Sequence, residues 1–165
     1  MTFVRYTAIM IKMIIITILL MFSVVFAEEL KAHKHLPYDT SITLLQGIQN
    51  DAIILGKGKK LVYVFVDPLC PHSRKFITMV SQSPTMLSRY RYCIFLYSIP
   101  RMKSTDVVSA VYMSPKPIET LLQIMVEKKV SSTKGDEATD ARVARIAEIA
   151  HKMDVYKRPY LVIKK

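Results

Sequence analysis

Residues 61–73 read Leu-Val-Tyr-Val-Phe-Val-Asp-Pro-Leu-Cys-Pro-His-Ser, an unbroken apolar run that stops at an Asp-Pro pair and is followed by a cysteine. The β-branched and aromatic residues 61–66 predict a strand buried on both faces, as parallel sheets require. A helix is predicted to begin at Cys70 or Pro71, because proline is favoured at the first helical position. The segment therefore predicts a strand-to-helix turn with a cysteine at the turn.

The rest of the chain predicts an α/β fold built around this strand. A second apolar run, 92–97, predicts a second strand, and residues 160–163 predict a short last strand. Between them, residues 104–153 carry three helical patterns of apolar residues. The order strand, helix, strand, helices, strand predicts an α/β sandwich with right-handed crossovers over residues 51–165.

The N-terminal residues predict export. Residues 1–12 contain Arg5 and Lys12 and no acid, and residues 13–27 are uncharged and strongly apolar. The run ends in Val-Phe-Ala at Ala27, which is the order of features in a secretory signal peptide. An uncleaved anchor is the competing interpretation, but 15 uncharged residues are fewer than the roughly 20 of a spanning helix. We therefore expect a signal peptide at 1–27 and an N-terminal segment with one short helix at 28–50.

Composition and charge narrow the range of partners. The 165 residues are 51% hydrophobic and 22% charged, which argues against a disordered tail, and the net charge is +11. This charge favours acidic surfaces. Because an exported chain rarely meets nucleic acid, we expect attraction to an anionic membrane face instead. The basic run at 56–60 lacks the spacing of a phosphate-binding loop and is expected to be a solvated turn.

Cys70 is the leading candidate for a reactive group. A cysteine at a helix N-terminus lies near unpaired N–H groups and the positive end of the helix dipole, and both favour thiolate over thiol. His72 is expected to tune this sulfur. The plainer interpretation is a buried, inert thiol, which we expect for Cys93 in the second strand. No metal site and no diffusible cofactor are expected, since Cys70 and His72 lack the further ligands that zinc requires.

Residues 64–76, from Val64 to Phe76, resemble the active-site segment of periplasmic disulfide isomerases of the DsbC/DsbG type, which have a thioredoxin-like fold. These domains also carry helices inserted before the last part of the sheet and a cis-proline loop that faces the active cysteine. Residues 154–162 resemble that loop and strand. The resemblance implies that Pro159 is the cis-proline and that the backbone of Arg158 binds substrate.

Two departures from that family qualify what the resemblance implies. Ser73 replaces the second cysteine of the Cys-x-x-Cys motif, so the site has no partner thiol for a disulfide of its own. The family's last strand and helix are expected to be missing, because the strand at 160–163 is followed directly by Lys164 and Lys165. The strand at 160–163 is therefore expected to need cover at its edge, from residues 53–55 or from another subunit.

The resulting hypothesis is an exported, periplasmic protein that exchanges thiols and disulfides through one nucleophile. Cys70 would attack, His72 would tune the thiolate, and Ser73 would hydrogen-bond it. Its partners would be cysteine-containing exported proteins or a thiol redox partner. The alternative is a non-catalytic chaperone or envelope-complex subunit of the same fold, and the oligomeric state stays open.

Overall fold

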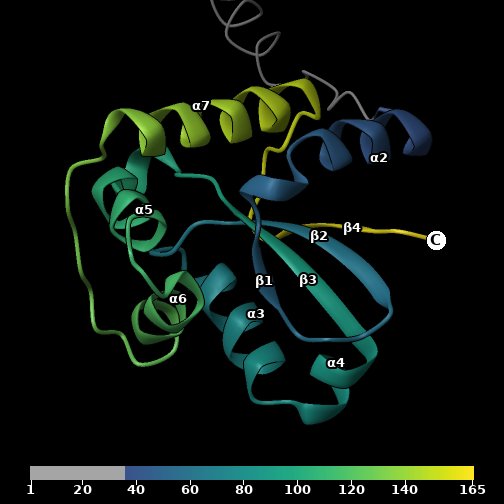
Figure 1. Ribbon diagram of the computed structural model, residues 1–165, viewed down its shortest axis with the longest axis horizontal. Helices are drawn as coiled ribbons and strands as arrows, with labels where there is room; N and C mark the ends of the chain where they lie inside the picture. Colours follow the sequence, from purple (N-terminus) through teal and green to yellow (C-terminus); the bar gives the residue numbers. More distant parts are fainter. Residues whose placement is uncertain (1–35) are drawn as a thin grey trace, which may run out of the picture. The chain divides into compact units, whose positions relative to one another are not determined.

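The computed structural model describes residues 36–165; the predicted signal peptide, 1–27, lies outside the described residues. Four strands form one sheet in the order β1-β3-β2-β4 (Figure 1). The strands are β1 (Ile53–Leu55), β2 (Lys60–Val66), β3 (Tyr90–Leu96) and β4 (Tyr160–Ile163). β2 and β3 run parallel, whereas β1 and β4 are antiparallel to their neighbours. The sheet is thus mixed, and the predicted crossover rule applies only between β2 and β3.

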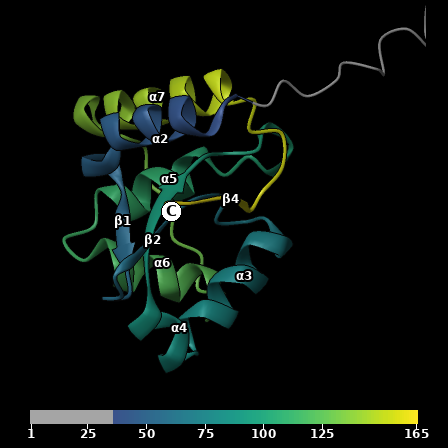
Figure 2. The same ribbon diagram turned by 90° about the vertical axis from the view of Figure 1, so that its right-hand side faces the viewer.

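Helices cover both faces of this sheet. α2 and α7 lie side by side on one face, and α3 packs with α6 on the other, as Figures 1 and 2 show. The helices are α2 (Tyr38–Gly47), α3 (Pro71–Ser81), α4 (Pro84–Arg89), α5 (Thr105–Tyr112), α6 (Pro117–Met125) and α7 (Glu137–Lys152). Two short 3-10 turns lie at Gln49–Asp51, after α2, and at Pro100–Met102, before α5. Among the described residues, no helix has the length and apolar character needed to cross a membrane.

The core lies on both faces of β2 and β3. Tyr63, Phe65 and Phe95 are fully buried, and the rings of Phe65 and Phe95 lie 5.2 Å apart. The alternation of side chains across a strand sends neighbouring residues to opposite faces, so an unbroken apolar run fills both layers. Leu45 of α2 is fully buried in the same core. The compact unit therefore includes α2, which precedes residue 51, where the sequence placed the start of the domain.

The edge of the sheet is arranged differently from the prediction. β1 (residues 53–55) pairs with β3 at the opposite edge and does not cover β4. Instead, Tyr38 of α2 reaches the end of β4: its hydroxyl donates to the carbonyl of Ile163 (3.2 Å) and accepts from the N–H of Lys165 (2.7 Å). The expectation that residues 53–55 cover this strand is therefore wrong, and Tyr38 of α2 hydrogen-bonds the backbone at the end of β4 instead.

Candidate active site

Cys70 occupies the N-cap position of α3, with Pro71 as the first helical residue. Its N–H donates to the carbonyl oxygen of Asp67 (3.1 Å), and its own carbonyl accepts from the N–H of Arg74 (2.9 Å). Its side chain accepts no capping hydrogen bond, and the residue is 4% exposed. The sulfur therefore lies at the N-terminus of the helix, where the unpaired N–H groups favour an anionic group.

Asp67 holds this turn in place, a role that was not predicted from the sequence. The residue is fully buried, and its Oδ1 accepts from the N–H groups of Leu69 (2.8 Å) and Cys70 (3.1 Å). Its Oδ2 accepts from the N–H of Ile99 (2.5 Å) and the hydroxyl of Ser104 (2.6 Å). One carboxylate thus ties the cysteine turn to the loop that follows β3. A buried carboxylate is tolerated because both of its oxygens are hydrogen-bonded.

Ser73 and His72, the two residues predicted to act on the sulfur of Cys70, have different surroundings: Ser73 is buried and His72 is exposed. Ser73 is fully buried, and its hydroxyl accepts from the N–H of Asp67 (3.2 Å). Among residues 36–165, no hydrogen bond joins Ser73 or His72 to the sulfur of Cys70. His72 is exposed in the first turn of α3. The Ser73 hydroxyl therefore supports the backbone of the turn.

The segment before β4 reaches the same end of the sheet. Tyr160 lies opposite Phe65 in the antiparallel pair of β2 and β4, so Pro159 adjoins the end of β2 that leads to Cys70. The peptide bond between Arg158 and Pro159 is cis. The pairing of β2 with β4 therefore places the cis-proline segment at the same end of β2 as the cysteine turn.

The side chain of Arg158 is held against this edge. Its guanidinium carbon lies 4.0 Å from the ring centroid of Tyr97, a cation–π contact. The N–H of Tyr97 donates to the carbonyl of Val66 (2.9 Å), which anchors the tyrosine beside the end of β2. The Nε of Arg158 is buried and has no hydrogen-bond partner among the described residues.

A groove lies beside the cysteine turn, between α3 and α6. It has a volume of about 700 Å³ and begins at Pro71. Apolar side chains and cations share its walls: Met79, Met125 and Val126, with Arg74, Lys75 and Lys128. The groove therefore presents both apolar and cationic side chains beside the cysteine turn.

Cys93 lies away from the candidate site. It is 1% exposed in the middle of β3, opposite Tyr63 of β2. β2 continues for three more residues before it reaches the end near Cys70, roughly 10 Å at strand spacing. A disulfide requires Cα atoms within about 7 Å. Burial raises the pKa of the Cys93 thiol, an effect that the positive charge of Arg91 offsets only in part. Cys93 therefore fits an inert core residue.

Metal ligands do not gather at the cysteine turn. The described part of the chain has no group of three or more His, Cys, Asp or Glu side chains that could hold an ion. The ring Nε2 of His151, in α7, lies 3.2 Å from the hydroxyl of Tyr97.

Comparison with solved structures agrees on the fold. DsbG of Helicobacter pylori superposes with a TM-score of 0.61 at 18% identity, covering 76% of this chain and 61% of that chain. The catalytic domain of Proteus mirabilis ScsC gives 0.55 at 13% identity, covering 75% and 85%. A periplasmic thioredoxin-like protein from Salmonella enterica serovar Typhimurium gives 0.53 at 12% identity, covering 79% and 86%. The chain has a thioredoxin-like fold.

This thioredoxin-like fold is recognised from structure alone. No protein-family model matches the chain, and no curated protein matches it significantly. The chain spans 61% of the length of Helicobacter pylori DsbG, which is less than two thirds. The fold places α5, α6 and α7 between β3 and the proline strand β4, as the helical insertion predicted from the sequence requires.

Proposed function

We propose that the protein is exported and exchanges thiols and disulfides through Cys70 alone. The observation that supports this most strongly is the position of Cys70: it is the N-cap of a helix, a buried carboxylate holds its turn, and the segment that contains Pro159 lies at the same end of β2. The second thiol, Cys93, is buried in the sheet. The fourth motif position holds a serine, so the two described cysteines cannot act as a pair.

The chemistry requires two exchange steps and no external oxidant. The Cys70 thiolate attacks one sulfur of a substrate disulfide; that S–S bond breaks, a Cys70–substrate disulfide forms, and the released substrate thiolate takes a proton from solvent. Another thiolate of the same substrate then attacks the substrate sulfur of the mixed disulfide. A new substrate disulfide forms, and Cys70 leaves as a thiolate. The number of disulfides is unchanged, so the net reaction is isomerisation.

The surroundings of Cys70 favour an extended substrate. Because Cys70 is only 4% exposed, an incoming disulfide must approach closely, which a flexible segment does more easily than a folded surface. The backbone of Arg158, next to Pro159, would pair with such a segment as an added strand. The groove that begins at Pro71 would take its neighbouring side chains. The partners would be exported, cysteine-containing proteins or a thiol redox partner, in the periplasm.

Refolding of a scrambled disulfide protein tests this proposal. Ribonuclease with randomly paired cysteines regains activity only if its disulfides are rearranged. The protein and its Cys93→Ser variant are expected to speed this recovery equally, whereas Cys70→Ser is expected to leave it at the uncatalysed rate. Loss of activity in Cys93→Ser, with retention in Cys70→Ser and correct folding of both, would overturn the assignment.

The alternative is a non-catalytic binding protein, and the burial of Cys70 favours it. In that case the groove between α3 and α6 would hold a client segment, and no sulfur chemistry would follow. The same refolding assay separates the two functions. A binding protein slows aggregation of the unfolded client without changing the rate at which active ribonuclease appears, and Cys70→Ser behaves like the unmodified protein.

A further inference from the structure

A basic surface lies at the pole of the sheet opposite Cys70, and the proposed function does not use it. A hollow of about 830 Å³ is lined by six exposed cationic side chains. These are Lys57, Lys59, Lys60, Arg91, Lys164 and Lys165, here called the basic pole. No acidic residue lines the hollow, and within residues 36–165 none of the six cations forms an ion pair. The pole therefore presents uncompensated positive charge.

The topology of the sheet gathers these cations from distant parts of the sequence. β2 and β3 are parallel, so Lys60 and Arg91 both lie at strand beginnings on one side. β4 is antiparallel to β2, so its end brings Lys164 to the same side. β2 then runs seven residues, roughly 20 Å, toward the turn of Cys70. The basic pole and the candidate active site thus face opposite directions along the strands.

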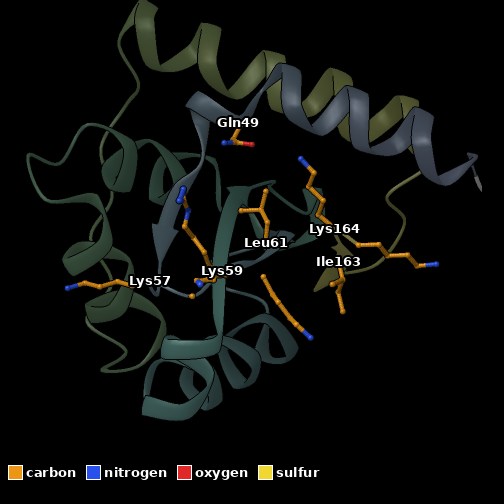
Figure 3. A pocket seen from close by; sticks show the side chains of 10 residues that line it. Gln49, Lys57, Lys59, Leu61, Ile163 and Lys164 are labelled. Atoms are coloured by element: carbon orange, nitrogen blue, oxygen red, sulfur yellow. The ribbon is translucent and has the colours of Figure 1, made fainter.

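The loop before β2 is held in a defined position. The N–H of Lys57 donates to the carbonyl of Leu87 (2.8 Å), and the N–H of Gly58 donates to the carbonyl of Tyr90 (3.1 Å). A Cβ at Gly58 would lie 2.0 Å from the carbonyl carbon of Arg89, so only glycine fits this approach. Figure 3 shows Lys59 and Lys164 around the hollow and Lys57 extending outward from its rim. The cations are therefore presented on a fixed backbone.

Charge is also segregated along the chain. Residues 52–105 contain nine Lys and Arg and a single acid, Asp67, which is fully buried. Eight of the 13 acids fall in residues 106–154, which include α5, α6 and α7. Residues 52–105 thus carry a net charge of +8, and four of their nine cations, Lys57, Lys59, Lys60 and Arg91, belong to the basic pole.

We propose that the basic pole binds an anionic lipid bilayer and orients Cys70 away from it. The apolar neighbours of the pole favour a bilayer over a soluble polyanion: Ile163 and Leu161, on the exposed face of β4, are 53% and 42% exposed. Lysines beside exposed aliphatic side chains are the combination that binds the interface of an anionic membrane. Single-stranded nucleic acid is disfavoured, because no aromatic side chain lines the hollow for base stacking.

Vesicle co-sedimentation tests this proposal. The full-length sequence is expressed and the purified product is used without further cleavage. The probes are vesicles of neutral phosphatidylcholine and vesicles that also contain 30% phosphatidylglycerol. Each lysine near an anionic surface contributes about fivefold to partitioning, so Lys59→Gln/Lys60→Gln/Lys164→Gln is expected to weaken binding to anionic vesicles about 100-fold. Raising the salt concentration is expected to weaken the binding of the unmodified protein. Any binding through residues 1–27 is common to the unmodified protein and its variants, so the comparison between variants cancels it.

A matched variant controls for net charge. Lys116→Gln/Lys129→Gln/Lys134→Gln also removes three positive charges, but from exposed positions outside the hollow. This variant is expected to bind anionic vesicles nearly as tightly as the unmodified protein does. Cys70→Ser is expected to bind unchanged, which separates this proposal from the proposed chemistry. Equal weakening in both triple variants, or equal binding to neutral and anionic vesicles, would overturn the proposal. Equally tight binding of inorganic polyphosphate, at the same concentration of negative charge, would also overturn it, because polyphosphate has no hydrocarbon region to receive the apolar side chains.

Discussion

Replacement of Asp67 by asparagine is expected to destabilise the protein by about 2–3 kcal/mol. The carboxylate accepts four hydrogen bonds, and three of their donors are backbone N–H groups, which can only donate. Asparagine must turn its NH₂ toward one pair of donors. The less costly choice faces Ile99 and Ser104, because the Ser104 hydroxyl can rotate and accept, but it leaves the Ile99 N–H unpaired. An orphaned buried donor costs about 1–3 kcal/mol, and the three remaining bonds lose their charge assistance.

Urea unfolding followed by circular dichroism measures this change. Asp39→Asn is the matched control, because Asp39 is exposed, and its effect is expected to stay within about 0.5 kcal/mol. A double-mutant cycle with Ser104→Ala is expected to be non-additive, since the two side chains share a 2.6 Å hydrogen bond. Asp67→Asn within 0.5 kcal/mol of the unmodified protein would refute the claim that this carboxylate organises the cysteine turn.

Three further predictions follow from the same structure. Ser73→Cys places a second sulfur at the spacing of a Cys-x-x-Cys motif, so a disulfide between residues 70 and 73 is expected after oxidation, and a free-thiol count is expected to show the loss of both thiols. A folded variant that keeps both thiols free would contradict the proposed proximity of residues 70 and 73. Asp51→Asn removes the negative charge beside Arg145 and Arg142 and one of the two acceptor oxygens; the hydrogen bonds from Arg145 are the main cause of the lowered pKa of Asp51. The lowered pKa means that the stability contribution, about 1 kcal/mol at neutral pH, is lost as the pH falls below about 4, so the two unfolding curves are expected to converge there. Tyr112→Phe leaves the N–H of Leu96 without its 3.0 Å acceptor and is expected to cost about 1–3 kcal/mol in urea unfolding; an unchanged midpoint would contradict it.

The sheet core and the cysteine turn could be predicted because their signals are local. The unbroken run at 61–66 corresponds to β2, and Pro71 begins α3 with Cys70 as its N-cap, as the sequence indicates. The last strand, 160–163, has the predicted bounds. In each case a run of residues of one type is bounded by proline or by a polar turn, so neighbouring residues suffice to define the element.

One element, α4, escaped prediction, and β1 was expected beside the wrong strand, because both depend on packing with other parts of the chain. α4 (Pro84–Arg89) has six residues and no buried side chain, so it shows no apolar period; its one signal is Ser83, whose hydroxyl accepts from the N–H of Met86. β1 has only three residues, and its choice of β3 as partner is a long-range pairing that local pattern does not encode.

Asp67 illustrates the same limit at the site. Its bonds to Leu69 and Cys70 are those of an Asp at a turn, which the Asp-Pro pair could have indicated. Its bonds to Ile99 and Ser104 span 32 and 37 residues and depend on the packing of the loop after β3. The role predicted for Ser73 was likewise inferred from spacing alone, whereas the structure directs its hydroxyl to the Asp67 N–H.

The reaction of the native protein with glutathione disulfide, followed by intact mass and peptide mapping, tests the central claim most directly. One glutathione is expected to be added at Cys70, at a rate that is unchanged in Cys93→Ser. In Cys70→Ser, no glutathione is expected at Cys93 until the protein is unfolded, because that thiol is 1% exposed and its pKa is raised by burial. Addition at Cys93 of the folded protein, or no addition at Cys70 while Cys93 reacts, would contradict the assignment of Cys70 as the nucleophile.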